Sequence, residues 1–585
     1  MVVESERGRR RRRRWLIGSA VVVVLVAWLA FLSARSLSAY HHDKQGLDLL
    51  EQVKAHLSPN DLTSSGSERL LDEAHAEFTT AQSDLSSPLF APVTIVPVVG
   101  RQLRSVRALS TAAGTVSAVG SDFLARVHTV INQPHAAGPE RVASLDTLAS
   151  VSAASAAQLR SIDTGPSQGL VSPLARKYNE FVSQLDSAQL RLTRAAAVSA
   201  AAASILNGPQ NYLVLASNNA EMRAGSGAFL DVGVAQTSDG AIHMGAFGPS
   251  ADFPLTQGQV AVTGDLQRNW GWLHPSLDFR NLGLTPQFDV TAPLAAAMWT
   301  ASTGQPVDGV IALDVAGLRQ LLEATGPVPV GNTTVSADTV EQYLLHDQYD
   351  GVTYVAGAGT SDRVDALGAL AREVLSQLQG QSTDLKSLAS SVSSAVAGRH
   401  LMIWSRDPAH QAAWAVSGVS GSLTPASVDV SLVNVGGNKL DQYMGIHVAV
   451  STRRSGSDTA VTMTTALSNT TPPGQSQYIA GPFPGDTAPY GSYIGVVADN
   501  LPGTASHITL TGAGPLAVDG AEGPTWVIGA PVTLDPGATA TVVTHFVMPG
   551  DHGSMTLVPS ARLPVEQWTA NGRAFDDSAP VTITW

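Results

Sequence analysis

The sequence predicts a multidomain α+β protein with an N-terminal transmembrane helix, a helical stalk or bundle, a three-layer α/β domain and a C-terminal antiparallel β-sandwich. Three observations predict this order. A long apolar run stands near the N-terminus, helix-period patterns follow it, and strand-like segments fill the remainder, first alternating with helices and then without them. The 585 residues are enough for three or four structural units.

The first element is a basic tail, residues 1–14, followed by an apolar run over residues 15–34. Twenty uncharged residues at helical rise span about 30 Å, the thickness of a hydrocarbon core. Seven Arg in the tail favour a cytoplasmic N-terminus. We therefore expect a single-pass protein of a bacterial cell membrane with the bulk of the chain extracellular.

A cleaved signal peptide is the alternative for this segment. It also has a basic start and an apolar stretch, and the small residues near Ser33 and Ala34 offer a cleavage site. The apolar run is longer than the usual 7–15 residues of a signal peptide, which favours a retained anchor. Either interpretation exports the same folded part.

Residues 36–206 predict the helical stalk or bundle. Apolar residues recur at helical spacing, as in LDLLEQVKAHL and SERLLDEAHAEF, and the pattern breaks at Pro59 and in SSPLFAPVTIVPVVG. An Ala-rich helix then ends before Asn207-Gly208-Pro209. A bundle that spaces and orients the next domain is the simplest interpretation.

Residues 207–420 predict the α/β domain. NYLVLASN is a short apolar strand, and FLDVGVAQTSDGAIHMGAFG predicts two strands joined at Ser238-Asp239-Gly240. Helical TAPLAAAMWTAS, the strand VDGVIALD and helical VAGLRQLLEAT follow, and SDRVDALGALAREVLSQLQ predicts a long helix. Such alternation is typical of helices packed on both faces of a sheet.

Residues 421–585 predict the β-sandwich. Helical periodicity is absent, and Val/Thr-rich runs such as SVDVSLVNV, IHVAVSTRR and TVVTHFVMP are separated by Gly, Pro and Asn. Turn signals at intervals of about ten residues, with no helix between them, favour antiparallel pairing.

Composition excludes several classes of function. The chain has no Cys, so disulfides, thiolate metal sites and a Cys nucleophile are ruled out. It carries 35 basic and 48 acidic residues, and beyond the tail 28 basic face 46 acidic ones, so nucleic acid is not an expected partner. Scarce Lys and abundant Ala, Gly and Val are typical of GC-rich genomes such as those of actinobacteria.

The segment directly after the first predicted strand carries the main candidate site. Glu221 is suited to hold a metal or a proton, and Arg223 to grip a phosphate. The glycines allow close backbone approach to an anion. The candidate ligand contacts here are Asn218, Asn219, Gly225 and Gly227. A Gly-rich turn pinned by a Glu–Arg pair explains the same residues equally well.

The motif NYLVLASNNAEMRAGSGAF, followed by VDGVIALD and LVNVGGNKLDQYM, resembles the bacterial family known as domain of unknown function 4012. The resembling elements are Asn218 to Phe229, Val307 to Val310, Leu322 to Val328 and Asn434 to Asp441. The resemblance extends over roughly residues 85–585. It implies family membership without an activity.

A fainter resemblance is to the LytR-CpsA-Psr phosphotransferases, which transfer lipid-pyrophosphate-linked glycopolymers. VDGVIALDVAGLRQLLEATGPVPV is similar to one of their elements, and Asp362 and Arg363 at the start of a long helix are similar to another. The resemblance implies that Arg223, Arg363, Glu221 and Asp231 are catalytic, with Mg²⁺ or Mn²⁺ as candidate metals. Their second Arg-containing element is missing here, where the chain reads GAFGPSADF, and Asp231 or Asp252 stands in for one carboxylate.

Other polar residues have structural explanations that are favoured over functional ones. We expect Asp308, Asp314 and Asp407 to cap turns and helices, and Asn434, Lys439 and Asp441 to join the sandwich to the α/β domain by hydrogen bonds. His41 and His42 are expected to be solvated. The chain has no HExxH, GxSxG, P-loop or dinucleotide motif.

Two functional hypotheses follow. In the first, a membrane-anchored protein of cell-envelope polysaccharide assembly binds or transfers a polyprenyl-pyrophosphate-linked glycan, with Arg223, Arg363 and Glu221 at the phosphates. In the second, the protein is a non-enzymatic envelope scaffold with other envelope proteins as partners and a degenerate phosphotransferase-like domain. The second predicts that Glu221 and Arg223 pair with each other and with backbone instead of lining an open pocket.

Overall fold

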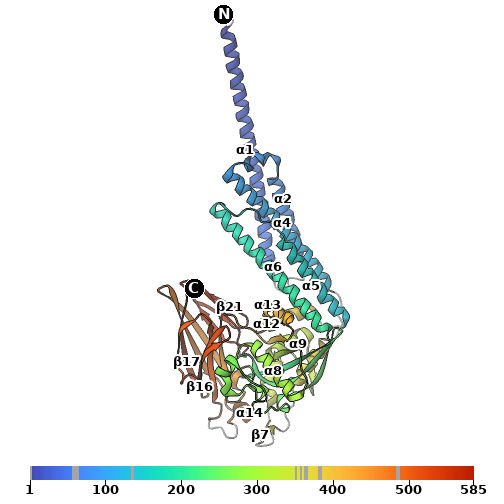
Figure 1. The fold of residues 1–585 in the computed structure, drawn as a ribbon, viewed down its shortest axis with the longest axis vertical. Helices are drawn as coiled ribbons and strands as arrows, with labels where there is room; N and C mark the ends of the chain where they lie inside the picture. Colours follow the sequence, from blue (N-terminus) through green and yellow to red (C-terminus); the bar gives the residue numbers. More distant parts are fainter. Residues whose placement is uncertain are drawn as a thin grey trace. The chain divides into compact units, whose positions relative to one another are not determined.

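The structure is a computed structural model that describes residues 3–55, 65–132, 138–349, 352, 354–355, 359–360, 366–379, 385–482 and 488–585. The chain divides into two compact units (Figure 1). The first comprises Met1–Gln133 and Asp146–Ala196, and the second comprises Pro134–Leu145 and Ala197–Trp585.

The first unit is helical, as the sequence predicts. Its helices, two of which continue into the second unit, are α1 (Val3–Ala55), α2 (Ser65–Leu85), η1 (Pro88–Phe90), α3 (Ala91–Thr94), α4 (Pro97–Ile131), α5 (Pro139–Arg160) and α6 (Ser172–Asn207). Small apolar clusters hold α1, α2 and α4 together, one of them around Phe78 and Ala113. Gly46 permits this packing, because a Cβ there would lie 2.7 Å from the Phe78 ring.

One helix among the described residues is long and apolar enough to cross a membrane. It is the Val23–Lys54 part of α1, and its most apolar window is almost entirely exposed. This helix is compatible with a single-pass anchor or a signal peptide.

A mixed five-stranded sheet forms the centre of the second unit's first half. Its order is β3-β2-β1-β4-β9, and only β1 and β4 run parallel. The strands are β1 (Gln210–Met222), β2 (Gly227–Ser238), β3 (Ala241–Pro249), β4 (Gly309–Asp314) and β9 (Leu401–Ser405). We call this the central sheet.

Successive residues of a strand point to opposite faces of the sheet, and in the central sheet apolar residues point to both faces. Helices therefore cover both faces. Leu213 and Leu215 of β1 belong to one buried cluster, and Ala216 belongs to another. The first cluster includes α7 (Gly264–Trp270) and α8 (Phe288–Thr303), and the second includes α9 (Val315–Thr325), α10 (Val340–Leu345) and α11 (Ala366–Gln377). The helical segments within 288–325 are confirmed.

Short elements complete this half. They are η2 (Ser250–Asp252), η3 (Gly271–Leu273), η4 (Phe279–Asn281), β5 (Val328–Val330), β6 (Thr333–Val335), η5 (Asp347–Tyr349), β7 (Tyr354–Val355), β8 (Gly359–Thr360), α12 (Leu385–Ala397) and α13 (Pro408–Ser417).

The C-terminal part contains two six-stranded sheets and only short helical turns, η6 (Leu440–Tyr443) and α14 (Gln477–Ala480), among its described residues. The β16 sheet has the order β15-β16-β13-β10-β18-β21, and the β17 sheet has the order β14-β17-β12-β11-β19-β20. Their strands are β10 (Ser427–Asn434), β11 (Met444–Ser455), β12 (Asp458–Asn469), β13 (Tyr493–Pro502), β14 (Ser506–Thr511), β15 (Val518–Glu522), β16 (Thr525–Leu534), β17 (Thr539–Met548), β18 (Ser554–Leu557), β19 (Gln567–Ala570), β20 (Arg573–Asp576) and β21 (Val581–Thr584).

The prediction of a purely antiparallel domain is wrong for two strand pairs. β10 pairs in parallel with β18, and β11 pairs in parallel with β19. Alternation of apolar and polar residues along a strand indicates which side chains are buried. It does not indicate whether the neighbouring strand runs parallel or antiparallel.

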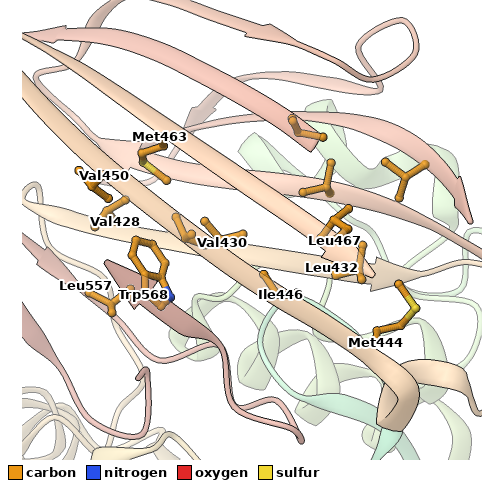
Figure 2. Packing of buried hydrophobic residues seen from close by; sticks show 14 of the residues in the cluster. Val428, Val430, Leu432, Met444, Ile446, Val450, Met463, Leu467, Leu557 and Trp568 are labelled. Carbon is orange, nitrogen blue, oxygen red and sulfur yellow. The ribbon is translucent and has the colours of Figure 1, made fainter. Parts of the chain in front are cut away.

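Side chains from both C-terminal sheets meet in one apolar cluster. Figure 2 shows Val428 of β10 with Val450 of β11 and Trp568 of β19 toward one end of this cluster, and Leu432 of β10 with Met444 of β11 toward the other. The opposite face of the β16 sheet is also buried, because Val433, Val496 and Val527 join the cluster that contains α7 and α8. All eight residues of β10 are consequently buried.

Candidate functional site

The predicted site lies where β1 ends and β2 begins, in a tight turn. The Arg223 N–H donates to the Ser226 carbonyl at 2.7 Å, and the Gly225 N–H donates to the Gly283 carbonyl at 2.9 Å. A Cβ on Gly227 would lie 2.1 Å from the Asn218 carbonyl oxygen. The two glycines therefore permit close backbone packing at this turn, and their backbone contacts are with the protein itself.

Glu221 is buried and both of its carboxylate oxygens have cationic partners. Oε1 accepts from Nη2 of Arg223 at 3.2 Å, and Oε2 is paired with Nζ of Lys439. Burial raises the pKa of Glu221, but the charges of Lys439 and Arg223 outweigh it, so the pKa lies below its ordinary value. Glu221 is an ionised carboxylate that is already neutralised by its neighbours.

The guanidinium of Arg223 is directed at protein acceptors. Nε donates to the Arg280 carbonyl at 3.0 Å, and Nη1 donates to the carbonyls of Met222 at 3.1 Å and Asn434 at 3.0 Å. With the Glu221 bond, every nitrogen of this guanidinium has an internal partner. The side chain is only 9% exposed.

Asp441 supplies the second half of the same arrangement. Its carboxylate is fully buried and accepts from the Met222 N–H at 2.9 Å, Asn434 Nδ2 at 2.9 Å, the Tyr493 hydroxyl at 3.0 Å and Arg562 Nη1 at 3.0 Å. Burial raises the pKa of Asp441, and the charge of Arg562 opposes that rise. The Met222 bond ties β1 of the central sheet directly to the C-terminal part.

We call these residues the Glu221 cluster: Glu221, Arg223, Asn434, Lys439, Asp441, Tyr493 and Arg562. Lys439 additionally lies over the rings of Tyr349 and Tyr478, with Nζ at 5.8 Å and 5.6 Å from their centroids. The predicted role of Asn434, Lys439 and Asp441 in joining the two parts of the chain is confirmed by these contacts.

The two asparagines of the motif also bond internally. Asn218 Nδ2 donates to the Tyr349 hydroxyl at 2.7 Å, and Asn219 Nδ2 donates to the Asp314 carboxylate at 2.9 Å. Asn219 Oδ1 accepts the Val315 N–H at 3.0 Å, at the first turn of α9. Both residues are fully buried and position neighbouring elements.

The remaining predicted site residues are placed as follows. Asp231 is fully buried within β2, opposite Ala216 of β1 and Pro249 of β3, and Asp252 is exposed in η2. Arg363 and Asp362 lie outside the described residues. The described geometry brings Glu221 and Arg223 together, and the roles of Arg363, Asp362 and Asp231 stay predictions.

The predicted capping roles of Asp314 and Asp407 are confirmed, whereas the Asp308 carboxylate instead accepts the Asn211 N–H at the start of β1 at 2.8 Å. Asp314 accepts the Gly317 N–H at 2.8 Å as the N-cap of α9 and also bonds Nδ1 of His400 at 2.8 Å. Asp407 accepts from Ala409 and His410 as the N-cap of α13. The expectation of solvated histidines is wrong for His42, whose Nδ1 lies 2.6 Å from Glu77 Oε2 in a half-buried contact.

Metal ligands do not gather in the described part of the chain, where no group of three or more His, Asp and Glu side chains is arranged to hold an ion. Two surface hollows lie elsewhere. One follows α6 near Asn179 and Leu190, and the other is lined by Pro293, Trp404 and Arg406. Neither is lined by Glu221, Arg223 or Asp231.

Sequence reasoning missed Arg562 and Tyr493, which complete the Glu221 cluster. Arg562 is 1% exposed and lies between two strands in a segment with no motif. The only local signal is a lone Arg among apolar and small residues, SARLPV, in a domain with few cations. Such a residue is expected to need a buried carboxylate partner.

These features define a class: a mixed α+β protein with one apolar N-terminal helix, a helical N-terminal region and C-terminal β-sheets, whose central motif is an internal joint. Within it, residues 207–349 match the family model described as "Protein of unknown function (DUF4012)". The match supports the family resemblance over these residues, which include β1, β2 and the Glu221–Arg223 pair. No curated protein and no solved structure matches the chain.

Proposed function

We propose that this protein is a membrane-anchored, non-enzymatic scaffold of the bacterial cell envelope. In this account α1 tethers the chain, and the central sheet and the two C-terminal sheets form one rigid body that presents surfaces to envelope partners. The observation that carries the proposal is the saturation of the motif: both oxygens of Glu221 and every nitrogen of Arg223 bond inside the protein.

The chemistry of phosphate recognition supports this choice. For Arg223 and Lys439 to bind a pyrophosphate, their guanidinium and ammonium donors would have to turn toward the ligand. Arg223 would have to abandon the carbonyls of Arg280 and Asn434, and Lys439 would have to leave Glu221 buried and less compensated. Removing a partner from a buried ion pair costs about 3–5 kcal/mol, which the ligand would have to supply.

Binding of a prenyl pyrophosphate tests the proposal. Full-length protein in nanodiscs is titrated with farnesyl pyrophosphate, with and without Mg²⁺ or Mn²⁺, and its thermal midpoint is recorded, because a specific ligand raises apparent stability. The scaffold account predicts the same midpoint at all concentrations. A saturable rise that disappears in Arg363→Ala would support the glycan-transfer hypothesis instead.

Complementation gives the matching cellular readout. In a strain of the native host that lacks the gene, Arg363→Ala should restore the phenotype as fully as the unmodified gene. Loss of complementation at unchanged protein level would contradict the non-enzymatic account and favour the glycan-transfer hypothesis, in which Arg363 binds the phosphates.

A further inference from the structure

A stretch of sixteen residues without a charged side chain, residues 85–100, begins at the last residue of α2 in the first unit. We call it the apolar segment. It forms η1, α3 and the first turn of α4. Several of its large side chains point into solvent, with Ile95 82% and Val98 63% exposed. The exposed set is Leu89, Ile95, Val96, Val98 and Val99.

The apolar segment packs beside the membrane-crossing part of α1. The Trp28 indole N–H donates to the Leu89 carbonyl at 2.9 Å. Phe90 and Leu85 share a buried cluster with Leu32, against which Phe31 also packs. Trp28 is seven residues before Arg35, the first charged residue after the apolar run. This contact therefore lies about 10 Å from Arg35 along the helix axis, inside the uncharged run.

The exposed side chains of α1 near this contact are also apolar. Val23, Val24, Leu25, Val26 and Leu29 are about half to two-thirds exposed. Exposed apolar side chains on two segments that pack together mark an interaction site. Lipid already has to cover the α1 side chains if the helix spans a bilayer, so the adjoining apolar segment shares the same surroundings.

Part of the backbone of the apolar segment meets the requirement that lipid imposes on polar groups. Pro88, Pro92 and Pro97 carry no N–H. Short helical bonds satisfy others, including Phe90 N–H to Ser87 O at 3.0 Å and Val96 N–H to Val93 O at 3.2 Å. The Thr94 hydroxyl donates to the Ala91 carbonyl at 2.7 Å.

Charged residues stand at both ends of the apolar segment and nowhere within it. Asp84 precedes it and is paired with Arg35, and Arg101 and Arg104 follow it on α4. Arg104 Nη1 reaches back to the Thr94 carbonyl at 2.9 Å. Cations beside an inserted apolar surface are placed to meet anionic lipid headgroups.

We propose that the apolar segment inserts into the membrane leaflet nearest the folded domains, so that the first unit contacts lipid through two segments, α1 and residues 85–100. This inference rests on the proposed membrane anchoring by α1. Its consequence is mechanical: a second lipid contact limits the tilt of the helical unit, whereas a single helix leaves that unit free to pivot.

The absence of Cys makes a direct test possible. Single-Cys variants Ile95→Cys and Val98→Cys of the full-length chain carry a nitroxide label in nanodiscs of phosphatidylcholine and phosphatidylglycerol. Label accessibility is measured to oxygen, which concentrates in lipid, and to a water-soluble nickel chelate. Val26→Cys reports on the span of α1, and Thr115→Cys, exposed on α4 about 25 Å further along that helix, reports on water.

The proposal predicts that Ile95→Cys and Val98→Cys resemble Val26→Cys, with high access to oxygen and low access to the nickel chelate. If they resemble Thr115→Cys while Val26→Cys lies in lipid, the inference is wrong and the anchor stands. Low access to both reagents at Ile95 would mean that protein, such as a second copy, covers the segment, and would also overturn it. An aqueous Val26→Cys would contradict the membrane anchoring itself.

Discussion

A buried carboxylate whose two oxygens each face a cation is already neutralised by the protein, and Glu221 is in this position. The same holds for Arg223, which faces carbonyl oxygens instead of a cavity. A Glu-x-Arg sequence after a strand is compatible with a phosphate site and with an internal ion pair. What decides between them is the set of groups that the rest of the fold brings to those side chains.

Asp429 is the residue from which we expect a pH effect. Burial raises its pKa from 3.8 to about 7, a Ser431 hydroxyl bond and the charge of Arg399 lower it, and Asp577 and Asp499 raise it further. Below pH 4 the folded and unfolded chains both carry this proton. Between about pH 4 and 7 the unfolded chain loses it first, so this group makes the protein less stable as pH rises.

The expected result is a fall in thermal midpoint from pH 4.5 to 7.5 that is smaller in Asp429→Asn than in the unmodified protein. Asn keeps the size of the side chain and removes its titration. Equal pH slopes for the two proteins would show that Asp429 does not hold a proton in the folded state.

At the scale of elements, short distances between backbone atoms determine which residues fit in the turn between β1 and β2. Gly227 has no room for a Cβ, which would lie 2.1 Å from the Asn218 carbonyl oxygen, and both register shifts of the β1–β2 pair occur nearby, after Ala216 and after Asn218. The glycines that suggested an anion-binding loop are therefore explained by strand packing.

Gly227→Ala should lower the thermal midpoint strongly, because its Cβ would overlap the Asn218 carbonyl; overpacking of this kind costs about 1–3 kcal/mol or more. Gly248→Ala in β3 is the matched control, since its Cβ would meet only Asp252 at 3.9 Å. Differential scanning calorimetry of the two variants measures the difference. A Gly227→Ala protein as stable as Gly248→Ala would contradict the described turn.

The type and order of the elements follow from periodicity, and their partners do not. Helical spacing, the alternating segments and the Val/Thr-rich runs predict the succession seen in the structure. The parallel pairs of β10 with β18 and of β11 with β19 depend on contacts more than a hundred residues apart, for which a local pattern has no signal. The sequence predicts that Asp441 bonds across the interface. It does not identify Arg562 as the ion-pair partner of Asp441, because the two residues are far apart along the chain.

At the scale of the whole molecule, the Glu221 cluster links β1 of the central sheet to strands and turns of the C-terminal part. Residues of β1, β10, η6 and β13 and the segment before β19 all contribute polar groups to it. The apolar cluster around α8 joins the central sheet to the β16 sheet in the same region. Polar and apolar contacts therefore both hold together the compact unit of Pro134–Leu145 and Ala197–Trp585.

The central claim is that the motif is a structural joint, and a double-mutant cycle of Glu221→Gln and Lys439→Met tests it most directly. Each single variant should lower the stability of the full-length protein by several kcal/mol, because it leaves a buried charge with fewer partners. The double variant should cost less than the sum, with a coupling of about 0.5–3 kcal/mol. Arg454→Met, at a pair whose Arg is 71% exposed, is the control and should be nearly neutral.

Thermal midpoints of these four variants and the unmodified protein are the measurement. The account predicts two destabilised single variants and a partly restored double variant. Unchanged or raised midpoints in Glu221→Gln and Lys439→Met would contradict it, because that outcome is typical of charges held in place for a ligand.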